Sequence, residues 1–137
     1  MNVLFVAGFG PIVKDPSATR AFYKDTLGLP LTDLSPEYSA LDGFDGVKHL
    51  GLWPLGDAAQ SCFGTREWPA DIPVPQATLE LEVDDVGGAA AEMEAAGHTL
   101  IHAAKTEPWG QEIARLLDPN GMLIGLCHTP WLHEDND

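Results

Sequence analysis

The sequence has few basic residues. Its 137 residues include 7 Lys and Arg against 21 Asp and Glu, which gives a formal net charge of −14 at pH 7. Such a chain lacks the basic surface that holds a polyanion, so we expect neither nucleic acid nor an anionic membrane as a partner. The charge is compatible with a cationic ligand, and it is equally compatible with a role in solubility alone.

Cysteines and long apolar runs are also scarce. Cys62 and Cys127 can form at most one disulfide and make no CxxC pair, so we expect two free thiols in a reducing cytoplasm, packed as small apolar side chains. No apolar run approaches the ~20 residues that a membrane-spanning helix needs. The apolar segment 3–13 lacks a positively charged start and contains Pro11, which favours a strand over a signal sequence.

Two helix starts stand out in what the sequence does contain. Asp15 followed by Pro16 predicts a helix over 16–27, because an N-cap Asp accepts backbone N–H bonds and proline suits the first helical position. Asp84-Asp85 predicts a second helix over 86–96. Gly28 and Gly97 follow these two segments as left-handed caps.

The two helices belong to two similar units. Segment 78–83 alternates apolar and polar residues, which is the pattern of a strand with one buried face. This strand, its cap, the following helix and the final Gly superpose on the corresponding unit of the first half at an offset of 70 residues. The pattern predicts an internal duplication, although strand–helix units are common enough to resemble one another by chance. The further strands are predicted at 29–34, 38–41, 47–53, 99–101, 112–117 and 123–127.

This order predicts one domain, 1–137, with a βαβββ module at 1–57, a linker at 58–76 and a second βαβββ module at 77–131. Within the linker, segment 64–75 is rich in proline and unsuited to a sheet interior. The final segment, 131–137, is expected to be a frayed, charged terminus.

Several of these segments together resemble the vicinal oxygen chelate superfamily, which contains glyoxalase I, the bleomycin-resistance proteins and the extradiol dioxygenases. The resemblance is carried by FYKDTLGL, LEVDDV and LLDPNGMLIGL, and Pro108-Trp109-Gly110 is most similar to the bleomycin-resistance-like branch. It implies an α+β fold in which two tandem βαβββ modules form a curved mixed sheet around a central cup. Leu79, Leu81 and Val83 would pack on the helix, and Thr78, Glu80 and Glu82 would face the cup.

The resemblance also locates four metal-ligand positions in the cup. They correspond here to Gly8, His49, Thr78 and Gly125. Glycine has no side chain, a threonine hydroxyl is a poor ligand for a transition metal, and one imidazole cannot fill a coordination sphere. We therefore expect no metal and no other cofactor, while a rearranged cup site built from His49, Glu80 and Cys127 stays open.

A cup without an ion can still bind a ligand. Trp53 shares a strand face with His49, and Trp109 lies on the loop at the expected rim. Each candidate also has a structural interpretation: tryptophans that fill the core, a packed His49, Glu80 and Glu82 on a solvated sheet face, and a surface ion pair of Arg115. His102, His128 and His133 show no ligand spacing. The predicted ligand-binding residues are His49, Trp53, Thr78, Glu80, Trp109, Arg115 and Cys127.

The preferred function is a cytoplasmic, metal-free protein that binds or sequesters a small aromatic or cationic molecule, as in antibiotic resistance. The resemblance implies a homodimer, with Trp68 and Pro69 available for its interface. The alternative is a glyoxalase-like lyase or isomerase, or a dioxygenase-like enzyme, in which His49 is catalytic or a rearranged metal acts. A third possibility is an interaction module whose cup is filled by its own side chains.

Overall fold

The computed structural model describes residues 1–133, which form two βαβββ modules and the segments that join and follow them. The first module consists of β1 (Val3–Val13), α1 (Pro16–Arg20), the π-helix η1 (Ala21–Thr26), β2 (Thr32–Asp33), β3 (Ser39–Phe44) and β4 (Val47–Pro54). The second consists of β5 (Ala77–Val83), α3 (Val86–Ala95), β6 (Leu100–Thr106), β7 (Glu112–Leu117) and β8 (Leu123–His128). Helix α2 (Leu55–Phe63) lies between them, and the 3-10 turn η2 (Pro130–Leu132) follows.

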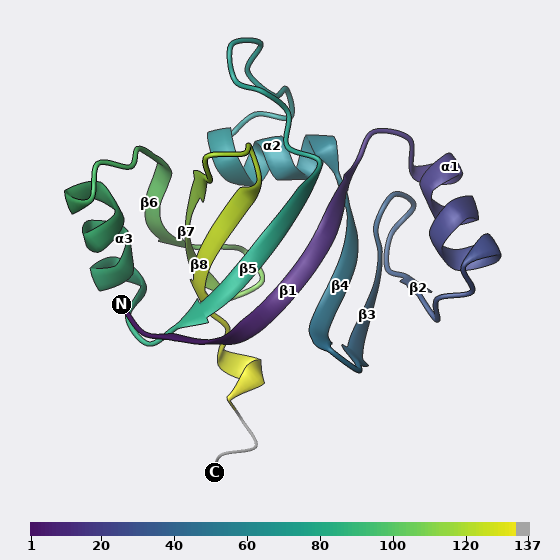
Figure 1. Ribbon diagram of the computed structural model, residues 1–137. Helices are drawn as coiled ribbons and strands as arrows, with labels where there is room; N and C mark the ends of the chain where they lie inside the picture. The colour runs from purple at the N-terminus through teal and green to yellow at the C-terminus, as the bar shows by residue number, and fades with distance from the viewer. Residues whose placement is uncertain (134–137) are drawn as a thin grey trace.

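All eight strands form one curved sheet in the order β2-β3-β4-β1-β5-β8-β7-β6 (Figure 1). The modules meet where β1 pairs antiparallel with β5, and each first strand also pairs in parallel with the last strand of its own module. The predicted fold class, an α+β fold of tandem βαβββ modules in a curved mixed sheet, is thereby confirmed. The two modules place their first strands side by side in the middle of the sheet.

Both helix starts form as the sequence predicts. The Asp15 carboxylate accepts the N–H of Ala18 at 3.1 Å, and the Asp85 carboxylate accepts the N–H of Gly88 at 3.0 Å. Gly28 and Gly97 have φ angles of 74° and 95°, which non-glycine residues rarely adopt. The first helix differs in detail, because its second half is the π-helix η1.

Three segments differ from their predictions. The strand expected at 29–34 is only Thr32–Asp33, consistent with the missing N–H of Pro30, whereas the one expected at 99–101 runs over Leu100–Thr106. Helix α2 was not predicted, and it occupies the start of the segment between the modules. No helix in the described residues is both long and apolar enough to cross a membrane.

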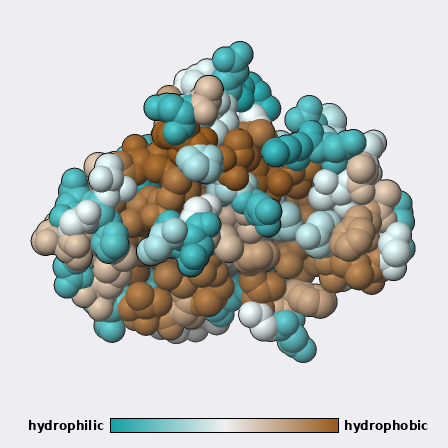
Figure 2. Space-filling model, turned by 45° about the horizontal axis from the view of Figure 1, so that its top comes forward, coloured by the Kyte–Doolittle hydropathy of each residue, from teal (hydrophilic) through white to brown (hydrophobic). Residues whose placement is uncertain are grey.

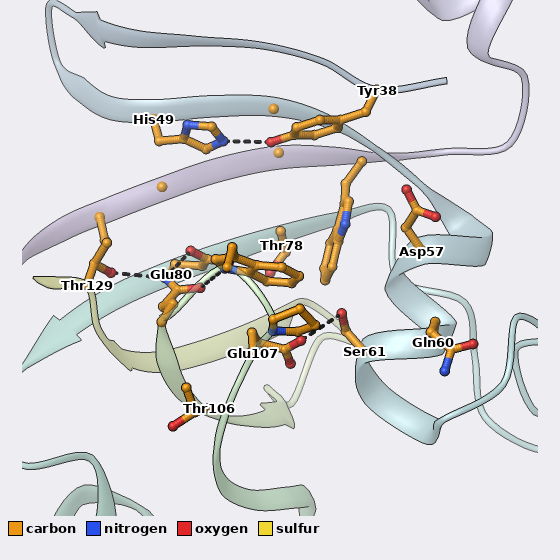
Figure 3. Close-up of a pocket in the computed structure, with 18 of the residues that line it drawn as sticks. Tyr38, His49, Asp57, Gln60, Ser61, Thr78, Glu80, Thr106, Glu107 and Thr129 are labelled. Carbon is orange, nitrogen blue, oxygen red and sulfur yellow. Dashed lines mark hydrogen bonds between the residues drawn. The ribbon is translucent and has the colours of Figure 1, made fainter. Parts of the chain in front are cut away.

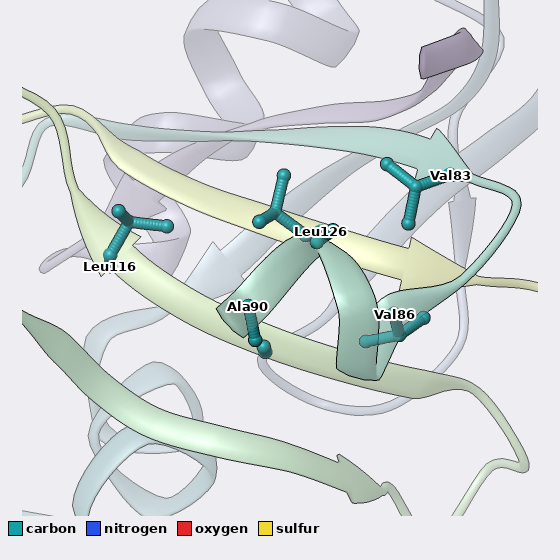
Figure 4. Close-up of a cluster of buried hydrophobic side chains, with 7 residues drawn as sticks. Val83, Val86, Ala90, Leu116 and Leu126 are labelled. Carbon is teal, nitrogen blue, oxygen red and sulfur yellow. The ribbon is translucent and has the colours of Figure 1, made fainter. Parts of the chain in front are cut away.

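The larger hydrophobic core lies between α3 and the second half of the sheet (Figure 4). Val83 of β5 and Leu126 of β8 are fully buried in it, together with Val86 and Ala90 of α3. Leu81 packs against the same cluster, which agrees with the predicted alternation along β5. A smaller core in the first module contains Val13, Leu31, Leu41 and Leu52.

Residues 131–133, the described part of the segment 131–137 that was expected to be frayed, pack against the sheet. Residues Pro130–Leu132 form η2, and His133 Nε2 lies 2.6 Å from the Glu82 carboxylate. This hydrogen bond fixes the turn against β5. Residues 134–137 lie outside the described part of the chain.

Strands β1 and β4 approach each other closely at Gly10. A Cβ atom on Gly10 would lie 2.3 Å from the backbone oxygen of Gly51, a contact that only a backbone shift can relieve. We predict that Gly10→Ala lowers the free energy of unfolding by about 1–3 kcal/mol or more, because it forces the parallel pair apart. Denaturant unfolding measures the change.

Gly87→Ala is the matched control for this prediction. A Cβ at Gly87, within α3, meets nothing closer than 3.8 Å, so alanine should be neutral or stabilise the helix by up to about 1 kcal/mol. Equal stability of Gly10→Ala and the unchanged protein would contradict the close approach of β1 and β4.

Candidate functional site

A pocket of about 800 Å³ lies on the concave side of the sheet (Figure 3). Strands β1, β4 and β5 form its floor. Helix α2 forms one wall, and the end of β6 with the segment that follows it, together called the 105–111 loop, forms a second. The segment after β8 closes another side. Its aromatic lining consists of Phe9, Tyr38, Trp53, Trp109 and Trp131. Figure 2 shows that apolar surface lies between hydrophilic residues on one face of the molecule, despite the net charge of −14.

Five of the seven predicted ligand-binding residues line this pocket: His49, Trp53, Thr78, Glu80 and Trp109. The predicted strand parity is correct, since His49, Gly51 and Trp53 of β4 all reach it. Trp109 stands at the rim with 48% of its surface exposed. Arg115 and Cys127 are not among the lining residues.

Arg115 lies behind the wall of the pocket, so its interpretation as a surface ion pair is wrong. Its side chain is 0% exposed and donates to the Glu107 carboxylate at 2.9 Å. Its guanidinium carbon lies 5.3 Å from the centroid of the Trp53 ring, which is cation–π geometry. Arg115 therefore supports two lining residues, Glu107 and Trp53.

Cys127 is fully buried beside Glu82, and its Sγ lies 3.4 Å from Glu82 Oε1. Burial raises the pKa of this thiol, and the nearby Glu80 and Glu82 charges raise it further. Both cysteines are free and buried, in agreement with their predicted role as apolar fillers. The rearranged metal site does not form, because the ligand atoms of His49, Glu80 and Cys127 do not group within 4.8 Å in the described residues.

His49 has two hydrogen-bond partners that the sequence analysis did not identify. Its Nδ1 lies 2.7 Å from the Asp42 carboxylate, and its Nε2 lies 2.8 Å from the Tyr38 hydroxyl (Figure 3). A carboxylate only accepts, so Nδ1–H donates to Asp42 and Nε2 accepts the Tyr38 O–H. The three side chains form a relay that ends with Tyr38 in the pocket.

Glu80 lies at the centre of the cup. It is opposite Gly8 in the β1–β5 pairing and beside Gly125 of β8. Its Oε1 accepts from the side-chain amide of Gln111 at 3.1 Å, and Gln111 Oε1 in turn accepts from the Trp109 indole at 3.0 Å. This chain of hydrogen bonds connects the carboxylate to an aromatic residue at the rim.

The four positions that correspond to metal ligands do not fit an ion. A Cβ at Gly8 would lie 3.5 Å from Glu80 Oε1, and a Cβ at Gly125 would lie 2.7 Å from Ile113 Cδ1. A side chain at position 125 would therefore have to displace Ile113. The Thr78 hydroxyl donates to the Leu123 carbonyl at 3.1 Å, and both His49 nitrogens are engaged. The family's metal chemistry has no donor set at these four positions.

The remaining charged residues of the pocket are paired. Asp57 accepts from Arg66 at 2.7 Å, and Glu107 lies 2.9 Å from Arg115 and 3.6 Å from Lys105. Ser61 of α2 donates to Glu107 at 3.4 Å, which joins α2 to the 105–111 loop. The α2 residues could not be assigned to the site from the sequence because α2 itself was not predicted, and the pairing of Glu107 with Arg115 joins residues of a loop and a strand.

Trp68, considered for a dimer interface, has partners within its own chain. Its ring meets Phe63 edge to face at 4.8 Å, and its indole N–H donates to the Ile72 carbonyl at 3.0 Å. These contacts fold the proline-rich segment back onto the end of α2.

Comparisons with known proteins agree with this architecture. A family profile described as the Glyoxalase/Bleomycin resistance protein/Dioxygenase superfamily matches residues 9–126. A search of curated protein sequences found no match.

Solved structures show the same fold at low sequence identity. A glyoxalase/bleomycin resistance protein/dioxygenase superfamily member from Vibrio splendidus 12B01 has a TM-score of 0.63 and 19% identity, over 90% of this chain and 97% of that one. Methylmalonyl-CoA epimerase from Mycobacterium tuberculosis has a TM-score of 0.59 and 19% identity, over 96% and 93%. A structure titled NAD-dependent benzaldehyde dehydrogenase from Legionella pneumophila has a TM-score of 0.59 and 16% identity, over 88% and 96%.

Tyr38 should ionise later than an ordinary tyrosine. Burial raises its pKa, and the Glu80 and Asp42 charges raise it further, so the hydroxyl stays an O–H donor well above pH 10. We predict a late tyrosine transition in an absorbance titration, absent in Tyr38→Phe and retained in Tyr23→Phe. The unfolded chain loses this proton near pH 10 while the folded chain keeps it, so stability should fall as the pH rises through about 10. Ionisation of Tyr38 at an ordinary pH would contradict its buried environment.

Proposed function

The chain belongs to the glyoxalase/bleomycin resistance protein/dioxygenase superfamily, and we propose that it binds a small aromatic, positively charged molecule in its cup. Binding would hold or carry the ligand without bond chemistry. The family's metal positions contribute no ion to this function, since their residues offer no donor set.

The environment of Glu80 carries the proposal. Of the three carboxylates that line the pocket, Asp57 and Glu107 are paired with basic side chains, and Glu80 takes part in no ion pair within residues 1–133. A carboxylate inside an aromatic cavity favours a ligand that brings its own positive charge.

The aromatic residues supply the second part of the recognition. Trp53 and Trp109 lie on different sides of the pocket, one on β4 and one on the 105–111 loop. A planar ligand between such rings gains stacking and cation–π attraction of about 0.5–2 kcal/mol per contact. Arg115 and Gln111 hold the two indoles in place before a ligand arrives, which reduces the entropy lost on binding.

One observation favours a second function, acid–base catalysis. The Asp42–His49–Tyr38 relay gives His49 an orienting partner and places the hydroxyl oxygen of Tyr38 in the pocket. In a lyase or isomerase of this kind, the Tyr38 oxygen would take a proton from the substrate while the Tyr38 hydroxyl proton passes to His49 Nε2. Some of the structural neighbours are methylmalonyl-CoA epimerases, which makes an acyl-CoA a reasonable first substrate to test.

The homodimer, the cytoplasmic location and the role in antibiotic resistance stay predictions. The ligand-binding function does not depend on any of the three.

The charge preference of the cup can be measured with matched probes. N-methylquinolinium and quinoline have the same ring system, and only the first carries a charge at pH 7.5. We predict that the protein prefers the cation and that Glu80→Gln weakens binding of the cation about tenfold, equivalent to about 1.4 kcal/mol, with little effect on quinoline. Isothermal titration calorimetry measures both affinities.

Asp71→Asn is the control, since it removes one negative charge at a residue that does not line the pocket. An equal loss in both variants would assign the effect to net charge and overturn the role of Glu80. If neither these probes nor a wider set of cationic aromatics binds, the ligand-binding function itself fails.

The second function predicts exchange of a substrate C–H proton with solvent. In D2O with methylmalonyl-CoA, the protein should catalyse deuterium incorporation, and His49→Asn should slow it by about 10²–10⁴-fold. Proton NMR follows the exchange, and His98→Asn, at an exposed position, is the control. No exchange above background would remove this function and leave the binding function standing.

A further inference from the structure

A cluster of metal-binding side chain types lies away from the metal positions of the family. The ligand atoms of Glu82, His128 and His133 all lie within 4.8 Å of one another. His133 Nε2 is 2.6 Å from Glu82 Oε2, and His128 Nδ1 is 3.8 Å from the same oxygen. These residues come from the end of β5, the end of β8 and the residue after η2, so the fold brings together two distant parts of the sequence.

Glu82 is an unusual carboxylate because it is 0% exposed and has no Lys or Arg partner among the described residues. The Thr129 N–H donates to its Oε2 at 2.6 Å, which fixes the orientation of the group. A buried carboxylate is stabilised by hydrogen bonds and by a nearby positive charge, and a bound ion would supply the second.

Both imidazoles lie beside this carboxylate. The His128 and His133 rings are stacked, with centroids 4.9 Å apart and planes at 19°. His133 Nε2–H donates to the Glu82 carboxylate at 2.6 Å, so a divalent ion would take the place of the hydrogen between these two groups. A divalent ion would compensate Glu82 and would be bound by both histidines.

We propose that Glu82, His128 and His133 bind a divalent transition-metal ion of the zinc class. Zinc ligands of this type lie about 2.0–2.2 Å from the ion, which places two ligand atoms of a tetrahedron about 3.3 Å apart. The observed distances of 2.6 and 3.8 Å to Glu82 Oε2 lie on either side of this value. The two rings would rotate out of their stacked arrangement to point both nitrogens at the ion, and water would complete the coordination.

The site is open to solvent on one side, and an ion bound there would fix the position of η2. The His128 and His133 side chains are 46% and 28% exposed, so the site has an open side. Thr129, Trp131 and Leu132, between the two histidines in sequence, line the pocket. A bound ion would therefore cross-link β5, β8 and η2 and fix one wall of the cup.

Calorimetric titration of tag-free full-length protein with Zn²⁺, and absorption titration with Co²⁺, test the site. We expect one ion per chain and a Co²⁺ spectrum of tetrahedral type. His128→Asn and His133→Asn should each weaken binding at least about tenfold, and the double variant should show no saturable binding. His98→Asn, which removes an exposed histidine outside the cluster, should bind like the unchanged protein.

Thermal unfolding separates this site from nonspecific binding at the acidic surface. Zn²⁺ at about 100 times its Kd should raise the Tm of the unchanged protein by about 5–10 °C and leave the Tm of the double variant unchanged. Both histidines are partly exposed, so the variants should stay folded, and circular dichroism without metal checks this. Equal affinity in the unchanged protein and the double variant, or equal losses in His98→Asn and His128→Asn, would overturn the site.

Discussion

The centre of the cup depends on two positions that have no side chain. Gly8 of β1 and Gly125 of β8 lie on either side of Glu80, and a Cβ at either would come within 3.5 Å of the Glu80 side chain. Since β1, β5 and β8 are neighbouring strands, the glycines leave the space that this carboxylate occupies. The two glycines offer no metal ligand, and the space that they leave holds a negative group that a charged organic ligand can reach.

The other carboxylates that line the pocket around this centre are neutralised by basic side chains, so Glu80 is the one that can pair with a charged ligand. Arg115 sits under the wall, where it neutralises Glu107 and supports Trp53, and Arg66 neutralises Asp57. Glu82, two residues further along β5, is buried outside the pocket lining and interacts with the C-terminal turn. Two carboxylates on one face of one strand thus have separate roles, one facing the cavity and one holding its wall.

Local patterns predicted most of the fold but only part of the site. Two local signals were sufficient to predict the modules: the N-caps Asp15 and Asp85 and the alternation along β5. The parity of β4 correctly placed His49 and Trp53 on the pocket side of the sheet. The partner of His49 could have been found, because Asp45-Gly46 is a two-residue hairpin turn whose register places Asp42 opposite His49. The burial of Arg115 and the contact of His133 with Glu82 depend on tertiary packing between residues far apart in sequence, which no local pattern encodes.

The most direct test of the account is anomalous X-ray diffraction from crystals of the full chain grown with Zn²⁺ or Co²⁺. The cup has a carboxylate and engaged imidazole nitrogens at its centre, while the Glu82 cluster has a three-residue donor set. We predict an anomalous peak between Glu82, His128 and His133 and none beside Glu80 and His49. A strong peak at the centre of the cup would contradict the central claim.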